Sequence, residues 1–447
     1  MTEEVTINYL CQSGGSLTGE IHVPGDKSIS HRSIMFGALA TGTTHISGFL
    51  QGEDSLATLN AFREMGVAII GPDADGNITI TGVGMSGLSE PKNKIYLGNS
   101  GTSMRLLTGL LAAQNFDLEL TGDSSLSSRP MKRVLLPIKE MGANLSTNEN
   151  QTAPIHINNS KKKHKLKGIA YSLPMASAQV KSCILLAGMY AEGKTCVTEP
   201  APTRDHTERM LNGFNYPVEV NSLGRGRSQI CIDGGGELKA CDLHIPADIS
   251  SAAFFMVGAC IAEDSNITLK HVGINPTRIG IINILQLMGA DITLENEKVV
   301  GGEPVADIIV RSSELHGIEI PEDQVPLAID EFPVIAIAAA CAEGQTILTG
   351  AEELRVKESD RIQAMIDGLQ ILGIECEGTD DGMIINGGKI SGGEVNSLGD
   401  HRIAMSFVIA SLRASDNISI LDCANVNTSF PHFVELANQS GLNLSII

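Results

Sequence analysis

Several features are scarce in this 447-residue chain, and each scarcity excludes a class of protein. The chain has no tryptophan and only 4% aromatic residues, so its core must be built mainly from aliphatic side chains and methionine. No apolar stretch approaches the roughly 18 to 20 residues that span a bilayer. Acidic residues outnumber basic ones by 52 to 32, and the resulting net charge of −20 argues against nucleic acid as a partner.

The nine cysteines are scattered singly, and no two form a CxxC pair. This pattern predicts reduced thiols in a cytoplasmic protein rather than a disulfide framework or a zinc site. The first residues, Met-Thr-Glu-Glu, are acidic where a signal peptide would be basic. The one basic run, residues 161–167, is interpreted as a solvated loop. We therefore expect a cytoplasmic protein that has no membrane partner.

The chain does contain a repeat. Six segments rich in small residues have helical character, recur at intervals of 71 to 80 positions, and run into a short turn and a strand. These segments are Ser28–Ala40, Ser100–Gln114, Ala176–Ala191, Ile249–Ala262, Ile329–Glu343 and Asp400–Ala414. In most units a second helix follows and closes on a glycine, namely Gly66, Gly142, Gly289, Gly373 and Gly441. Repeated units stack around shared cores, and the chain length favours two domains.

Basic side chains gather near the starts of several of these helices, for example Lys27, Arg129, Arg361 and Arg402. A helix N-terminus has unpaired N–H groups and about half a positive charge, so it attracts phosphate or carboxylate groups. The fork of an arginine matches such groups in a bidentate way. The sequence thus predicts a site for several anionic groups together.

Two carboxylates, Asp330 and Glu358, also occur near predicted helix starts, where the basic side chains gather. An acidic residue at a helix start is usually a cap, and that interpretation is favoured for either residue alone. Beside a cationic site, however, each becomes a candidate for proton transfer.

One motif is misleading. The segment Gly188–Thr195 satisfies the spacing of a Walker A loop. A phosphate-binding loop of that kind runs from strand to loop to helix, whereas this segment is predicted to run from helix to turn to strand. We interpret the match as coincidence.

Seven motifs, taken together and in order, resemble those of the 5-enolpyruvylshikimate-3-phosphate synthases, a family of enolpyruvyl transferases. The motifs are residues 24–32, 98–102, 177–181, 204–209, 354–362, 399–405 and 429–431. The resemblance implies an α/β fold, a two-domain inside-out α/β barrel of six βαβαββ repeats with its active site in the interdomain cleft. One domain would be residues 25–245, mainly on the shikimate 3-phosphate side. The other would be residues 1–24 with 246–447, mainly on the phosphoenolpyruvate and acid–base side.

The resemblance also implies a reaction and its residues. The enolpyruvyl group of phosphoenolpyruvate would pass by addition and elimination to the 5-hydroxyl of shikimate 3-phosphate, with phosphate released and no metal or organic cofactor. Phosphoenolpyruvate would be held through its phosphate by Lys27 and Arg129 and through its carboxylate by Arg361 and Arg402. Shikimate 3-phosphate would be held by Ser28, Arg32, Ser177, Gln179 and Arg204. Asp330 would deprotonate the 5-hydroxyl, and Glu358 would handle the carbon-bound proton, with Lys27 sharing the acid–base work.

The sequence departs from the family at Thr428, where many members have lysine, and His401 or Lys357 is the candidate replacement. Gly101 is expected to line the pocket in which glyphosate competes with phosphoenolpyruvate, and the enzyme is expected to be a monomer. Two alternatives stay open. One is the related transferase that acts on UDP-N-acetylglucosamine, which would have a reactive cysteine on an exposed loop. The other is a non-catalytic anion-binding repeat protein.

Overall fold

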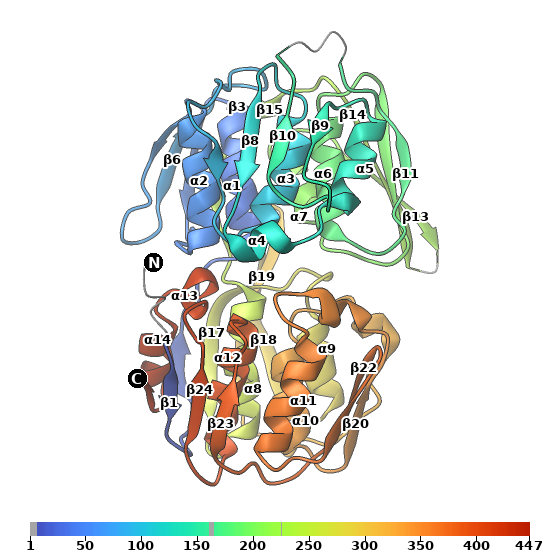
Figure 1. Ribbon diagram of the computed structural model, residues 1–447. Helices are drawn as coiled ribbons and strands as arrows, with labels where there is room; N and C mark the ends of the chain where they lie inside the picture. Colours follow the sequence, from blue (N-terminus) through green and yellow to red (C-terminus); the bar gives the residue numbers. More distant parts are fainter. Residues whose placement is uncertain (1–6, 161–164, 225) are drawn as a thin grey trace. The chain divides into compact units, whose positions relative to one another are not determined.

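The computed structural model describes residues 7–160, 165–224 and 226–447 (Figure 1). Contacts divide the chain into two compact units, each with its own apolar core. Unit 1 comprises Met1–Pro24, Pro246–Val299 and Glu303–Ile447, and unit 2 comprises Gly25–Ile245 and Val300–Gly302. The greater part of the predicted basic loop, residues 161–164, lies outside the described residues.

Each of the six predicted repeat helices is confirmed, with starts within three residues of the prediction. They are α1 (Lys27–Leu39), α3 (Gly101–Leu111), α6 (Ala178–Gly188), α8 (Ile249–Ile261), α10 (Phe332–Cys341) and α12 (His401–Ala410). In five of them the residue before the helix caps it with a side-chain oxygen, whereas α10 has a proline in its first turn. The residues of α8 are buried along its whole length, because its sequence is almost entirely small or apolar.

The second helices end where the glycines predicted. They are α2 (Glu53–Glu64), α5 (Lys132–Glu140), α9 (Gly280–Leu287), α11 (Arg361–Ile371) and α14 (Phe433–Ser440), and α7 (His206–Gly213) follows the third repeat helix. Just beyond five of them lie Gly66, Gly142, Gly289, Gly373 and Gly441, with φ of 88°, 94°, 98°, 83° and 118°. Glycine adopts this left-handed conformation without the steric cost of a side chain.

Within the described part of unit 2, three four-stranded sheets and one pair of strands are present. Their orders are β16 (Leu243–His244), β4 (Thr43–Ser47), β6 (Ile78–Thr81), β5 (Ala68–Ile70); β7 (Ile95–Tyr96), β8 (Leu118–Thr121), β10 (Ile155–Ile157), β9 (Leu145–Ser146); β11 (Ala170–Ser172), β12 (Lys194–Glu199), β14 (Arg227–Asp233), β13 (Glu219–Gly224); and β15 (Leu238–Lys239) with β3 (Ala40–Thr41). A short helix, α4 (Ser124–Ser128), precedes Arg129.

Unit 1 has two four-stranded sheets and a three-stranded one among the residues described. Their orders are β23 (Gly393–Asn396), β24 (Ile418–Leu421), β1 (Tyr9–Cys11), β25 (Leu444–Ile446); β18 (Asp291–Val300), β19 (Glu303–Arg311), β17 (Asn266–Gly273), β2 (Thr18–Ile21); and β20 (Gln345–Leu348), β22 (Gly382–Asn386), β21 (Cys376–Thr379). Helices α8, α10 and α12 pack against one another, and β1 is inserted between β24 and β25. A short helix, α13 (Val426–Ser429), and 3₁₀ turns at Glu322–Gln324, Glu352–Val356 and Ser411–Arg413 complete the unit.

The cysteine prediction is wrong at one pair. Cys196 and Cys231 form a disulfide in unit 2, although 35 residues separate them in sequence. They stand directly opposite each other on the antiparallel strands β12 and β14, with a Cα–Cα distance of 4.1 Å. Only the strand pairing brings them together, so their spacing carried no signal. The other cysteines are free, as predicted, and burial raises the pKa of three of them, Cys260, Cys341 and Cys423, to about 12.

The predicted coincidence at Gly188–Thr195 is confirmed. Gly188 ends helix α6, and Lys194 begins strand β12, so the segment runs from helix to turn to strand. Nor is any helix in the described ranges both long enough and apolar enough to cross a membrane.

Candidate active site

In unit 2, five of the predicted site residues lie at the starts of three helices, namely Lys27 and Ser28 at α1, Gly101 at α3, and Ser177 and Gln179 at α6. Asp26 caps α1 by accepting from the N–H of Ile29 at 2.8 Å. Ser100 and Ser177 cap α3 and α6 through their hydroxyl oxygens. Ser177 caps α6 through its oxygen, so the proton of its hydroxyl is still available for donation to an anion. Ser100 is fully buried and its hydroxyl also lies 2.6 Å from Ser103 Oγ, so Ser100 serves the helix start alone.

The starts of α3 and α6 are tied together by Gln179. Its Nε2 donates to Thr102 Oγ1 at 3.2 Å, and its Oε1 accepts from Arg105 NH1 at 2.5 Å. Arg105 lies in α3, just beyond the sequence motif of residues 98–102, and has no predicted role. It is a residue that sequence reasoning missed, because only the packing of α3 on α6 places it beside the predicted ligand Gln179.

Lys27 and Arg129 are also held in defined positions. Lys27 Nζ lies 2.5 Å from Asp54 Oδ2, a carboxylate in the first turn of α2. Arg129 NH2 donates to Asn99 Oδ1 at 2.5 Å. Gly101 lies close to Arg129, since a Cβ added to Gly101 would stand 3.2 Å from Arg129 NH1. The glycine thus borders a residue predicted to bind phosphate.

Arg32 is buried and makes three hydrogen bonds with neutral oxygens. Its Nε donates to Thr207 Oγ1 at 2.7 Å and its NH2 to Ser182 Oγ at 2.8 Å. Its NH1 donates to the carbonyl of Ser28 at 2.9 Å. These bonds connect α1, α6 and α7, and Arg204 lies in the loop that leads into α7. All five residues predicted to hold shikimate 3-phosphate therefore belong to unit 2.

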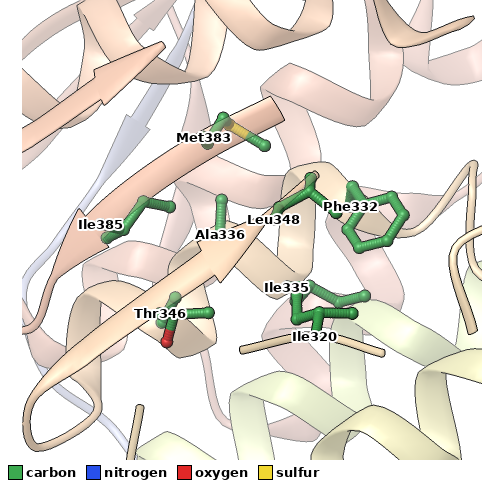
Figure 2. Close-up of a pocket in the computed structure, with 9 residues that line it drawn as sticks. Ile320, Phe332, Ile335, Ala336, Thr346, Leu348, Met383 and Ile385 are labelled. Carbon is green, nitrogen blue, oxygen red and sulfur yellow. The ribbon is translucent and has the colours of Figure 1, made fainter. Parts of the chain in front are cut away.

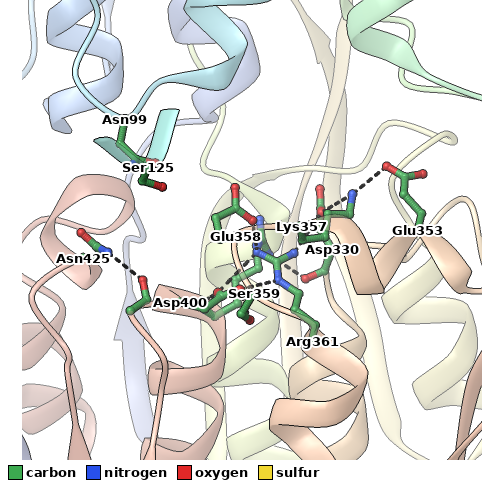
Figure 3. Close-up of polar contacts among 12 residues, drawn as sticks. Asn99, Ser125, Asp330, Glu353, Lys357, Glu358, Ser359, Arg361, Asp400 and Asn425 are labelled. Carbon is green, nitrogen blue, oxygen red and sulfur yellow. Dashed lines mark hydrogen bonds and ion pairs between the residues drawn. The ribbon is translucent and has the colours of Figure 1, made fainter. Parts of the chain in front are cut away.

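In unit 1 the predicted residues converge on Arg361 (Figure 3). Its guanidinium lies 2.8 Å from Asp400 Oδ2, 2.7 Å from Glu358 Oε2 and 3.4 Å from Asp330 Oδ1. Burial by itself lowers the pKa of Arg361, but these three carboxylates outweigh it and raise the pKa. Arg361 is thus a permanently charged centre that holds three acidic groups from three segments of the chain.

Asp330 is in contact with two further cations. Lys357 Nζ lies 3.4 Å from Asp330 Oδ1 and 2.9 Å from Glu353 Oε1. Burial lowers the pKa of Lys357, but Asp330 and Glu353 outweigh this effect and raise it. Arg402 NH1 donates to the backbone carbonyl of Asp330 at 2.9 Å. Asp330 is therefore the residue at which the three predicted cations of unit 1 meet.

Two further carboxylates of this cluster were not predicted as site residues. Asp400 is fully buried, and it caps α12 through the N–H of Arg402 at 2.9 Å. Burial raises the pKa of Asp400, but Arg361 and His401 outweigh it and lower the pKa. Glu331 is 1% exposed and lies 3.7 Å from Arg402 NH1. Asp400 and Glu331 are acidic residues at helix starts, as Asp330 is. Nothing in the sequence distinguished these two from ordinary helix caps.

Thr428 does not substitute for the lysine of related sequences. Its hydroxyl donates to the carbonyl of Asn425 at 2.7 Å, within its own short helix. Asn425 in turn donates to the carbonyl of Gly399, next to Asp400. This segment therefore supports the turn that starts α12. Of the two candidate replacements, Lys357 already pairs with Asp330 and Glu353.

An apolar cavity in unit 1 is separate from this cluster (Figure 2). It is lined by side chains of α10 and of strands β20 and β22, including Phe332, Leu348 and Met383. Its volume is about 10 Å³, which is room for one water molecule at most. It is a packing gap of the core and too small for a substrate. No group of three or more histidine, cysteine or acidic side chains is placed to hold a metal ion in the described part of the chain.

Comparisons with known proteins agree over nearly the whole chain. The family model described as EPSP synthase (3-phosphoshikimate 1-carboxyvinyltransferase) matches residues 11–436. A protein of Hydrogenovibrio crunogenus named 3-phosphoshikimate 1-carboxyvinyltransferase is 60% identical over 443 residues, which cover 99% of each chain. One with the same name from Methylococcus capsulatus is 63% identical over 433 residues and 97% of each chain.

Solved structures also resemble this chain. An EPSP synthase structure from Acinetobacter baumannii superposes with a TM-score of 0.89 at 58% identity, covering 99% of this chain and 100% of the other. The enolpyruvyl transferase NikO from Streptomyces tendae has a TM-score of 0.78 over 99% of each chain. It is only 16% identical, so its likeness shows the α/β fold alone.

Proposed function

The chain belongs to the EPSP synthase (3-phosphoshikimate 1-carboxyvinyltransferase) family, and from this membership we propose how its residues divide the reaction. The enzyme transfers the enolpyruvyl group of phosphoenolpyruvate to the 5-hydroxyl of shikimate 3-phosphate and releases phosphate, a step of the shikimate pathway. This chemistry needs cations for two phosphates and a carboxylate. It also needs a base for the hydroxyl and an acid for the methylene carbon.

Shikimate 3-phosphate binds to unit 2, through Ser28, Arg32, Ser177, Gln179 and Arg204. The support is that Ser28, Ser177 and Gln179 lie at helix starts, which attract anions, while Arg32 lies in the second turn of α1 and Arg204 in the loop before α7. Arg32 is already oriented by Thr207 and Ser182, so little side-chain freedom is lost when a phosphate binds.

Phosphoenolpyruvate binds through its phosphate to Lys27 and Arg129 and through its carboxylate to Arg361 and Arg402. The contact between Arg361 and Asp330 is 3.4 Å, longer than the 2.7 and 2.8 Å contacts with Glu358 and Asp400. A bound carboxylate therefore displaces Asp330 from Arg361 most readily. This exchange leaves Asp330 able to accept the proton of the 5-hydroxyl.

The proton steps belong to Asp330, Glu358 and Lys27. The 5-hydroxyl oxygen bonds to the central carbon of phosphoenolpyruvate while its proton passes to Asp330. The methylene carbon gains a proton and becomes a methyl group. It then returns a proton as phosphate leaves, and Glu358 serves this carbon with Lys27 in support. Glu358 suits this role because its side chain is 33% exposed, more than Asp330 at 16% or Asp400 at 0%.

The finer architecture is part of the same proposal. Each unit consists of three βαβαββ repeats of an inside-out α/β barrel, and residues of both units act on one pair of substrates in an interdomain cleft. The packing of α8, α10 and α12 against one another, next to the sheets of unit 1, supports the three repeats of that unit. Glyphosate competes with phosphoenolpyruvate, and the enzyme works as a monomer.

The convergence of three cations on Asp330 is the observation that carries the proposal. A phosphate-release assay tests it, with phosphoenolpyruvate plus either shikimate 3-phosphate or UDP-N-acetylglucosamine as acceptor. Release only with shikimate 3-phosphate is expected. Release with the sugar nucleotide would favour the related transferase, and binding of both phosphate compounds without release would favour a non-catalytic protein.

A further inference from the structure

A group of three charged side chains is buried in unit 2, outside the residues assigned to the substrates. Lys181 Nζ lies 3.0 Å from Glu199 Oε2 and 2.7 Å from Glu208 Oε1. The exposed fractions of the three residues are 0%, 5% and 4%. Burial lowers the pKa of Lys181, but Glu208 and Glu199 outweigh it and raise the pKa, so the ammonium stays charged. Burial also raises the pKa of Glu208, and Lys181 offsets this effect only in part. We call Lys181, Glu199 and Glu208 the buried triad.

The buried triad brackets one loop. Glu199 is the last residue of β12, and Glu208 lies in the first turn of α7, and residues 200–205 form the loop between this strand and this helix. Lys181 comes from a third element, helix α6. One ammonium group therefore holds both ends of this loop against α6. Burying a charged ammonium costs free energy, and close carboxylate partners offset this cost only at short distances. The three side chains must therefore stay in place.

The triad reaches into the loop through Thr203. The Thr203 hydroxyl donates to Glu199 Oε2 at 2.7 Å, the same oxygen that lies against Lys181. The next residue along the chain is Arg204. The neighbours of the triad residues in sequence, Ser182 and Thr207, hold Arg32. The contact between α6 and α7 thus supports both arginines assigned to shikimate 3-phosphate.

We propose that Lys181, Glu199 and Glu208 are positioning residues that fix Arg204, through Thr203, for the phosphate of shikimate 3-phosphate. The inference rests on the proposed role of Arg204. The triad acts on ground-state binding of one substrate, since its contacts within unit 2 lead to Thr203 and α7 and so to the arginines assigned to shikimate 3-phosphate. Its loss raises the KM for shikimate 3-phosphate and leaves kcat and the KM for phosphoenolpyruvate near their original values.

The Thr203→Val variant tests the proposal, because it removes the hydroxyl at nearly constant volume in a half-buried position. Lys181→Met is less suitable, since it leaves two buried carboxylates without their counter-ion and is expected to unfold the unit. Thr198→Val is the matched control. Thr198 is also half-buried and lies on β12, and its hydroxyl accepts from Gln229 Nε2 rather than contacting the triad.

Thr203→Val should raise both the KM and the calorimetric Kd for shikimate 3-phosphate about tenfold, the usual effect of losing a hydrogen bond to a charged group. Thr198→Val should change neither by more than about twofold. Equal KM and Kd values for shikimate 3-phosphate in Thr203→Val and Thr198→Val would overturn the proposal. The same would follow if Thr203→Val lowered kcat and left this KM unchanged.

The Arg204→Ala background separates positioning from a general loss of stability. If Thr203 acts through Arg204, adding Thr203→Val to Arg204→Ala should weaken shikimate 3-phosphate binding no further. A second tenfold loss in the double variant would show that Thr203 acts independently, and would contradict the proposal. The Kd measurement needs no turnover, and phosphate release by the wild-type enzyme decides the proposed function separately.

Discussion

Arg32 and Arg129 of unit 2 are held differently from Arg361 and Lys357 of unit 1, although Lys27 of unit 2 also lies against a carboxylate, that of Asp54. In unit 2, Arg32 and Arg129 donate to hydroxyl, amide and carbonyl oxygens. In unit 1, Arg361 and Lys357 lie against carboxylates, so positive and negative charges are interleaved. A neutral partner orients a guanidinium without cancelling its charge, whereas a carboxylate both orients and neutralises it. The first arrangement suits anion binding, and the second keeps proton acceptors ionised beside the cations.

The largest expected effect tests the proton chemistry of unit 1. Asp330→Asn and Glu358→Gln keep the side-chain shape and remove the acid–base group, so kcat should fall by ~10² to 10⁴. The affinity for each substrate, measured by calorimetry, should change far less.

Glu353→Gln is the control for these two variants, because Glu353 also pairs with Lys357 but has no assigned role in the reaction. Its kcat should stay near that of the wild type. Survival of turnover in both Asp330→Asn and Glu358→Gln would contradict the assignment of the proton steps.

Removing an arginine should have different consequences in the two units. Arg361→Met leaves buried Asp400 without its counter-ion, so it should lower the free energy of unfolding by roughly 3 to 5 kcal/mol. Arg129→Met removes a partly exposed side chain that donates to Asn99 and Ser125, and it should cost less than about 1 kcal/mol. Urea unfolding followed by circular dichroism measures both. Similar losses of unfolding free energy in the two variants would contradict the proposed difference between the arginines of the two units.

Binding of phosphoenolpyruvate should depend on cations from both units. A hydrogen bond to a charged group is worth ~1.5 to 3 kcal/mol, so Lys27→Ala and Arg402→Ala should each weaken affinity at least tenfold. Equilibrium binding measured by calorimetry decides this. Lys194→Ala is the control, since Lys194 is an exposed cation paired with Glu219. Unchanged affinity in either site variant would remove that residue from the phosphoenolpyruvate site.

The smallest expected effect concerns Gly101 and glyphosate. A methyl group there would stand 3.2 Å from Arg129 NH1 and 3.4 Å from Arg105 NH1, so one of these side chains must shift. Overpacking of this kind costs ~1 to 3 kcal/mol, so Gly101→Ala should weaken inhibition roughly ten- to a hundredfold. The wild-type enzyme should be measurably inhibited, and the variant should lose modestly in phosphoenolpyruvate affinity.

Gly213→Ala is the matched control for glyphosate titration. Gly213 lies in helix α7, and the nearest neighbour of an added Cβ there is 3.8 Å away. Its inhibition constant should equal that of the wild type. An unchanged inhibition constant in Gly101→Ala as well would mean that Gly101 does not line the pocket.

Features with local causes could be predicted from the sequence. The caps Ser100 and Asp400 marked helix starts, and Gly66 and its counterparts marked helix ends, because these preferences act within one turn of the chain. The positions of Asp330 and Arg361 near helix starts followed from the same signals.

Features that depend on distant pairing could not be predicted. Lys181 lies in a predicted motif, but its burial between Glu199 and Glu208 depends on how α6 packs on β12 and α7. The disulfide of Cys196 with Cys231 likewise depends on strand register. For Arg361, the sequence indicated a cation near anions of the substrate but not that carboxylates of the protein already surround it.

The insertion of β1 between β24 and β25 also bears on the order of events during synthesis. Tyr9 pairs with Ile420 and Ile446, so the partners of β1 are translated roughly four hundred residues after it. At about 5 to 20 residues per second, the ribosome needs on the order of 20 to 80 s to cover that distance. Unit 2 is completed within this interval, whereas the sheet that contains β1 can close only at the end of translation. The nascent chain therefore carries an unpaired apolar strand for nearly its whole period of synthesis, which is when a chaperone has most opportunity to bind it.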